Sequence, residues 1–182
     1  MLPLDSPRWR ELKANGDASE IPRLIAELRQ AHSSEQFMRL WEALWESIYH
    51  QYDIYSASYA VVPHIVDLMA QSPPEKRLPF ASAIGMIAAL AHCKDVDPVP
   101  EDIKPDYFAS LEKVAEFILD CFKVNWTDEE YAILCGALAA VQGHPVLAID
   151  LMEVIANPSE IFCSKCEEFF PSFGYELILG DE

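Results

Sequence analysis

The sequence predicts an all-α protein, an irregular α-α superhelix of about seven helices that ends in a short C-terminal β-hairpin or irregular tail. Three observations predict it. Apolar residues recur every three or four positions along most of the chain, which is the period of a helix with one buried face. Proline, glycine and capping residues divide this pattern into segments of helical length. Of the 182 residues, 51% are hydrophobic and 24% are charged, so the chain can bury one substantial core as a single domain of residues 1–182.

The first three predicted helices have clear apolar faces. Ser19 is a candidate N-cap for the first, whose apolar residues are Ile21, Leu24, Ile25 and Leu28. Ser33 or Ser34 precedes the second, whose apolar residues are spaced 3-1-3-1-3 at Phe37, Leu40, Trp41, Leu44, Trp45 and Ile48. Pro63 lies inside the third and is expected to kink or divide it. One stripe of this third helix holds Ala57, Ala60, Val61, His64, Ile65 and Leu68.

A fourth helix follows Pro74, which stands at a plausible first-turn position. Its small residues would permit a neighbouring helix to approach closely, and they are Ala81, Ala83, Gly85, Ala88 and Ala89. Residues 94–105 contain three prolines and four acidic residues and form the longest predicted loop. A fifth helix is expected near residues 106–122.

The sixth and seventh helices are defined by their ends. Thr127 and Glu130 have the spacing of a capping box, which begins the sixth helix. Gly143 ends it, Pro145 begins the seventh, and Pro158 stops that one. Short connections predict antiparallel neighbours, paired second with third, fourth with fifth and sixth with seventh. Such pairs cannot bury their apolar stripes alone, so they must stack into a superhelix or close as a bundle.

The last segment differs from the helices. Residues 158–182 alternate apolar and polar side chains around Pro171 and Gly174, which predicts a short hairpin. We expect this tail to cap the open end of the helical stack, because stacked repeats need a polar outer cover.

The tail also contains the CxxC pair Cys163 and Cys166. A structural zinc site needs four ligands, and no Cys or His follows Cys166. The remaining ligands would come from His144, Cys135 or a second chain. Thiols that pack in the hairpin without a metal are the first interpretation, and zinc is the alternative.

The stretch "LWEALWESIYHQYDIYSASYAVVPHIVDLM", residues 40–69, resembles a group of uncharacterised bacterial HEAT-like helical-repeat proteins. These pair a Trp-rich helix ending in His-Gln-Gly with an Ala-rich helix that contains a Val-Pro step. The matching residues here are Trp41, Trp45, His50, Gln51, Tyr55, Ala57, Ala60, Val62 and Pro63, and Tyr52 stands where the family favours glycine. The resemblance implies a HEAT-like α-α superhelix that acts as an interaction scaffold, and it implies no catalytic residue.

The reactive side chains of this stretch have structural interpretations. His50, Gln51 and Asp53 are expected to form a polar turn between two helices, with a His–Asp acid/base pair as the alternative. His64, on an apolar stripe, is expected to be a core histidine bonded to a carbonyl. The aromatic residues step at three or four positions, which predicts a packing seam of Trp41, Trp45, Tyr49, Tyr52, Tyr55 and Tyr59.

The charge of −17 is unevenly spread. Residues 1–100 carry 13 acidic and 9 basic side chains, whereas residues 101–182 carry 17 and 4. No arginine follows Arg77. Such a chain repels nucleic acids and anionic membranes and would attract a basic protein. The alternative is an acidic surface that serves only the solubility of the protein. The acidic residues expected to contact such a partner are Asp106, Glu112, Glu116, Asp128, Glu129 and Glu130.

Two functions of different classes follow. The first is a non-catalytic, cytoplasmic interaction module without a cofactor, for example an immunity protein that neutralises a basic toxin. The cytoplasmic location is expected because the chain shows neither a signal peptide nor an apolar run long enough to span a membrane. The second is a metal-dependent hydrolase within a helical bundle, using His50, His64, His92 and Asp53. The sequence leaves the oligomeric state open.

Overall fold

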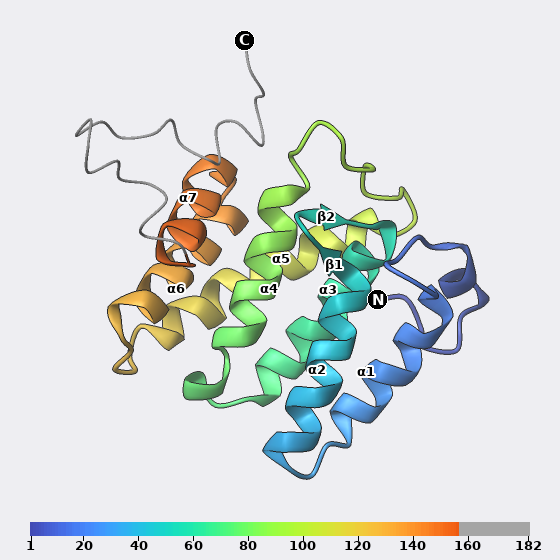
Figure 1. The fold of residues 1–182 in the computed structure, drawn as a ribbon, viewed down its shortest axis with the longest axis horizontal. Coiled ribbons are helices and arrows are strands. Elements are labelled where there is room, and N and C mark those ends of the chain that lie inside the picture. The colour runs from blue at the N-terminus through green and yellow to red at the C-terminus, as the bar shows by residue number, and fades with distance from the viewer. Residues whose placement is uncertain (157–182) are drawn as a thin grey trace.

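A computed structural model describes the backbone of residues 1–156 and the side chains of residues 1–152. It contains the seven helices α1 Ile21–Arg29, α2 Ser34–Ile48, α3 Ser56–Gln71, α4 Leu78–Leu90, α5 Lys104–Cys121, α6 Asp128–Val141 and α7 Pro145–Ala156. The predicted all-α fold is therefore confirmed (Figure 1). The tail at 158–182, with Cys163 and Cys166, lies outside the described residues.

Shorter elements complete the described chain. Three 3-10 helices, η1 Pro7–Glu11, η2 Ala18–Glu20 and η3 Pro74–Lys76, precede α1 and α4. Strands β1 Tyr49–His50 and β2 Asp53–Ile54 form an antiparallel hairpin between α2 and α3, where the sequence predicts only a turn. The longest loop between described helices runs from residue 91 to residue 103, close to its predicted position.

Local hydrogen bonds explain several of the boundaries. Ser33 Oγ accepts a hydrogen bond from the Gln36 amide at 3.1 Å and caps α2. Thr127 and Glu130 form the predicted capping box of α6. The predicted cap at Ser19 is wrong, because the Asp17 carboxylate accepts from the Ser19 amide and caps η2. Helix α3 continues through Pro63 without a break.

The helices pair only partly as the sequence predicts. The expected contact of α2 with α3 is slight, because the hairpin separates the two helices. The predicted pairing of α6 with α7 is confirmed, and the other extensive contacts join α1 with α2, α3 with α5, and α4 with α6. Figure 1 shows α4 between the pair α1 and α2 on one side and the pair α6 and α7 on the other. Most of α4 is buried as a result, from Phe80 to Leu90.

Small residues set the distance between α4, α6 and α7. A Cβ atom built on Gly85 of α4 would lie 2.6 Å from the Cα atom of Ala137 in α6. A Cβ atom on Gly136 would lie 3.0 Å from the carbonyl oxygen of Ala148 in α7. Close approach at the small residues of the fourth helix is therefore confirmed, and the neighbour is α6.

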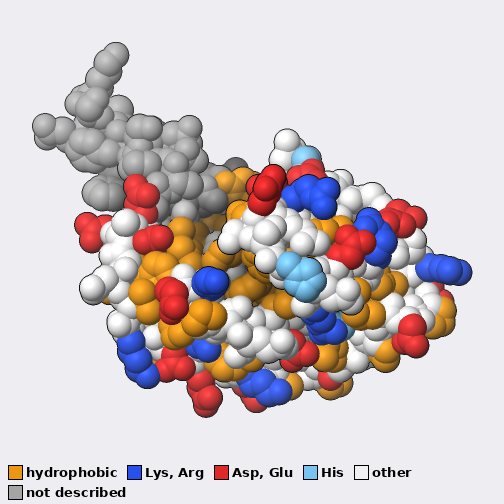
Figure 2. All heavy atoms as spheres, turned by 90° about the horizontal axis from the view of Figure 1, so that it is seen from below, with side chains coloured by type: hydrophobic (Ala, Val, Ile, Leu, Met, Phe, Trp, Pro, Cys, Tyr) orange, Lys and Arg blue, Asp and Glu red, His pale blue; other side chains and the backbone are white. Residues whose placement is uncertain are grey.

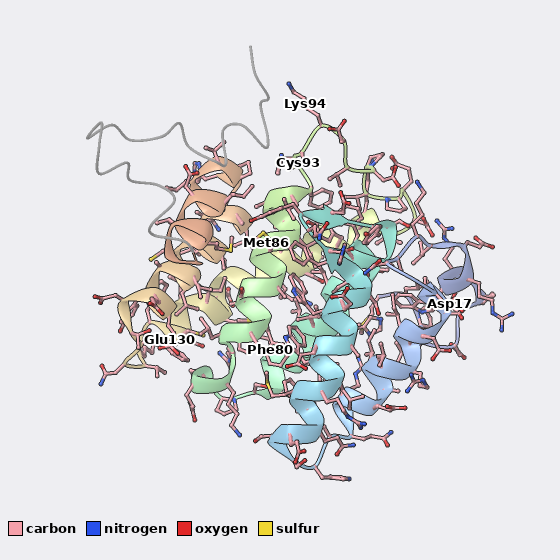
Figure 3. The ribbon with its side chains drawn as sticks, in the orientation of Figure 1. Asp17, Phe80, Met86, Cys93, Lys94 and Glu130 are labelled. Atoms are coloured by element: carbon pink, nitrogen blue, oxygen red, sulfur yellow. The ribbon has the colours of Figure 1, made fainter. Side chains whose placement is uncertain are left out.

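Aromatic rings fill the other side of α4. The Phe80 ring, labelled in Figure 3, packs edge-on against Trp41 of α2 with ring centroids 5.2 Å apart, and against Phe37 at 5.9 Å. Tyr59 of α3 and Tyr107 of α5 make a similar edge contact at 5.3 Å. The aromatic seam is thus partly formed as predicted, with partners from α4 and α5 that the sequence pattern alone does not identify.

The N-terminal segment is fixed to the loop between α4 and α5. The guanidinium of Arg8 donates two hydrogen bonds to the Asp102 carboxylate, at 2.9 Å and 3.3 Å. Lys13 forms an ion pair with Asp97 at 2.6 Å, and the Tyr59 hydroxyl donates to the Asp97 carbonyl at 2.9 Å. The N-terminal segment therefore lies beside a loop that is about 90 residues away in the sequence. The N-terminal segment and this loop are both attached to α3.

Candidate functional site

His50, Gln51 and Asp53 form the turn between α2 and α3. The backbones of His50 and Asp53 are paired across the hairpin. Gln51 has a φ of 48° and Tyr52 a φ of 68°, so both loop residues are left-handed. Two such residues define the tight hairpin turn that matches strand twist and favours asparagine and glycine. This explains why glycine would suit the position of Tyr52.

The left-handed turn leads to a prediction about stability. Replacing Gln51 by asparagine is expected to raise the free energy of unfolding by roughly 0.5 kcal/mol, because asparagine tolerates this conformation better. Urea unfolding of both proteins measures the change. Gln142→Asn is the matched control, since Gln142 is also exposed but has a φ of −91°. An equal increase in the free energy of unfolding of Gln142→Asn would show that the stabilisation does not come from the left-handed turn.

His50 lies at the surface beside a carboxylate of α2. Its Nδ1 atom is 3.1 Å from Glu46 Oε1. His92, which follows α4, is exposed as well. Within residues 1–152 no group of three or more His, Cys, Asp or Glu side chains is arranged to hold a metal ion. The histidines and Asp53 of the hydrolase hypothesis are therefore not assembled into a metal site in this part of the chain.

His64 is a buried structural residue. Its Nε2 donates to the Leu2 carbonyl at 2.9 Å, and Arg29 Nη2 donates to its Nδ1 at 3.1 Å. The ring is therefore neutral, and burial lowers its pKa to about 4. The Trp9 ring lies 6.0 Å away, centroid to centroid. The predicted core histidine bonded to a carbonyl is confirmed, and it attaches the N-terminal segment to α3.

A pocket of about 410 Å³ lies between the N-terminal segment, α3 and the start of α5. Its charged groups are paired with one another. Asp102 accepts from Arg8, a hydrogen bond that holds the pKa of the Asp102 carboxyl below its usual value. Asp106, expected to contact a partner, lies 2.5 Å from the amine of Met1. The acidic groups here stabilise the attachment of the N-terminal segment.

The other acidic candidates lie on α5 and in the first turn of α6. Glu130, which Figure 3 labels near one end of the molecule, is the reciprocal partner of Thr127 in the capping box. Glu130 therefore has a structural role at the start of α6. The remaining four acidic side chains are exposed and form no ion pair with described residues, and they are Glu112, Glu116, Asp128 and Glu129.

Exposed apolar side chains lie next to these acids on α5. Phe108 is 51% exposed and Leu119 is 54% exposed. At 100° per residue, Phe108, Ala115 and Leu119 fall within about 40° of one another on the helix, and Glu112 falls beside them. We call this the α5 surface, composed of Phe108, Leu111, Glu112, Ala115, Glu116 and Leu119. The opposite side of α5 is buried at Tyr107, Ser110, Val114 and Ile118.

The sequence prediction missed the apolar half of the α5 surface. The signal is present, since "KPDYFASLEKVAEFILDC" has apolar residues on two sides of the helix. Figure 2, which views the molecule from below, shows apolar side chains exposed at several places on this face, between charged residues. Exposed apolar surface is therefore a general feature of this molecule and not confined to one residue.

Comparison with family models, curated proteins and solved structures finds no match for this chain. The HEAT-like resemblance therefore remains a prediction. Among residues 1–156, no helix combines the length and the apolar character required to cross a bilayer.

Proposed function

We propose that this protein is a non-catalytic, cytoplasmic module that binds a basic protein, as an immunity protein binds its toxin. The observation that carries the proposal is the set of four exposed acidic side chains without an ion-pair partner, Glu112, Glu116, Asp128 and Glu129. Several other acidic residues are paired with a cation, as Asp97, Asp102 and Asp120 are. No cofactor is required for binding of this kind.

The charge of the whole chain supports the same partner chemistry. The net charge of −17 produces a field that accelerates encounter with a cationic protein and opposes encounter with nucleic acids. Of the neighbouring lysines, Lys104 is paired with Glu101 and Lys123 with Asp120, whereas Lys113 of α5 is exposed beside Glu112. Residues 104–130 carry seven acidic side chains and three lysines. The α5 and α6 region is therefore a centre of negative charge.

Capture followed by kinetics tests the proposed function. The immobilised protein is incubated with a lysate of its own source at low salt, and bound proteins are identified by mass spectrometry. We expect a basic protein whose association rate falls by at least about tenfold when ionic strength rises from about 0.01 M to about 1 M, because the Debye length shrinks from about 30 Å to about 3 Å.

Matched variants assign the effect to the proposed residues. Neutralising the four acids (Glu112→Gln, Glu116→Gln, Asp128→Asn and Glu129→Gln) is expected to slow association, but by less than high salt does, because a net charge of −13 out of −17 remains. The control neutralises four exposed, unpaired acids elsewhere (Asp5→Asn, Glu35→Gln, Glu42→Gln and Glu75→Gln). Equal effects of the two sets would show that only net charge matters. A folded bait that retains no basic protein would contradict the proposed function itself.

A further inference from the structure

We propose that the α5 surface is a docking face for an amphipathic helix of the partner, with leucine-type side chains on one face and lysine or arginine along its edges. This inference rests on the proposed function, for which it specifies the surface and the chemistry of the bound segment.

The apolar residues of the α5 surface have the spacing of a helix-binding face. Phe108, Leu111, Ala115 and Leu119 follow one another at intervals of three, four and four positions. Phe108 and Leu119 are separated by three turns, about 16 Å along the axis. A helix that lies along such a stripe makes contacts at its own i, i+3, i+4 and i+7 positions.

One end of this stripe continues onto α6. Phe122 follows Leu119 by three positions, and its ring stacks on Tyr131 with centroids 6.0 Å apart and planes inclined by 19°. The Tyr131 hydroxyl donates to the Val124 carbonyl at 2.9 Å, which fixes this ring in place. The apolar stripe therefore ends against a rigid aromatic pair, beside the first turn of α6 with Asp128 and Glu129.

The acidic residues select the charge of the occupant. Glu112 lies at the edge of the apolar stripe and Glu116 farther out on the same side, about 40° and 80° around the helix from Phe108. Neither forms an ion pair with a described residue. A second copy of this chain would bring Glu112 and Glu116 against their own equivalents, and like charges in direct apposition oppose binding. A cationic helix satisfies both the apolar and the acidic groups.

A synthetic peptide tests the proposal directly. The probe is a fluorescein-labelled helical peptide of about 18 residues, with leucine on one face and lysine on both flanks, which spans about five turns. Fluorescence anisotropy measures its binding to the full chain at low salt. Two peptides serve as controls: one with the same composition in scrambled order, and one with glutamate in place of lysine.

The expected result combines affinity with location. The amphipathic cationic peptide should bind, both control peptides should bind at least about tenfold more weakly, and amide NMR shifts should change along α5. Phe108→Ser and Leu119→Ser should each weaken binding by about tenfold, which corresponds to about 1.4 kcal/mol. Met38→Ser in α2 and Leu147→Ser in α7 are the matched controls, because these residues are 45% and 52% exposed.

Several results would overturn the proposal that the α5 surface binds such a helix. Equal binding of the scrambled peptide, an equal loss in the Met38 or Leu147 variant, or shifts confined to other helices would each do so. A dimer in sedimentation that Leu119→Ser dissociates would assign the face to a second copy instead. Leu119→Ala, with circular dichroism, checks that a loss of binding is not a loss of fold. These results are separate from the capture experiment, since a basic partner that binds elsewhere would sustain the proposed function and refute only the role of the α5 surface.

Discussion

Replacing Gly85 by alanine is expected to lower the free energy of unfolding by about 2 kcal/mol, because the added methyl group overpacks the contact of α4 with α6. The new Cβ atom would lie 2.6 Å from the Cα atom and 2.8 Å from the Cβ atom of Ala137. Alanine improves helix propensity by about 1 kcal/mol relative to glycine, so an unhindered position would become more stable. A decrease in the free energy of unfolding would therefore indicate that α4 and α6 approach closely at Gly85, and an increase would indicate free space. Urea denaturation measures this change.

Two further variants separate backbone overlap from side-chain overlap. Ser82→Ala, on the same helix but half-buried, controls for general effects of alanine in α4. In the double variant Gly85→Ala with Ala137→Gly, the Cβ overlap is removed but the 2.6 Å overlap with the backbone persists. We expect only partial recovery in the double variant. A single variant as stable as the wild type would refute the close packing of these helices.

The sequence predicts the helices of this fold well because their signals are local. The apolar spacing in residues 37–48 and the Thr127–Glu130 pair need no information from distant residues, and both appear as expected in α2 and α6. The pairing of the helices, in contrast, cannot be predicted from local signals. It depends on which apolar faces meet, for example Gly85 with Ala137, and residues 52 positions apart carry no local record of that contact.

The hairpin between α2 and α3 was missed for a different reason. Its loop is Gln51-Tyr52, and neither residue is typical of a left-handed turn. The pairing of Tyr49 with Ile54, on each side of this loop, overrides the local preference. Tertiary contacts thus impose a conformation that the loop sequence itself would disfavour.

The candidate site could be predicted only in part. Counting charges identifies the acidic half of the chain, but not which acids are already paired. Asp106 lies beside the Met1 amine and Glu130 caps α6, and these roles depend on three-dimensional position. For Phe108 and Leu119 the difficulty is that α5 is apolar on two sides, so periodicity cannot decide which side is buried.

His64 is expected to make the fold sensitive to mild acid. The unfolded chain takes up a proton near pH 6.5, whereas the buried ring does so only near pH 4. The folded pKa is the lower one, so this contribution to stability is complete above about pH 6.5 and is lost as the pH falls towards 4. Between about pH 7 and pH 5 the loss should be about 2 kcal/mol. Urea unfolding at each pH measures it.

The variant His64→Gln isolates the contribution of this ring. Glutamine can still donate to the Leu2 carbonyl and accept from Arg29, but it does not titrate. Other groups near the ring, such as Asp67, which lies 3.6 Å from Arg29, remain in both proteins and cancel in the difference. The wild type should therefore lose about 2 kcal/mol more than the variant between about pH 7 and pH 5. If the stabilities of the wild type and the variant had the same pH dependence, protonation of His64 would cost no stability. That result would contradict the contacts of His64 with Arg29 and the Leu2 carbonyl.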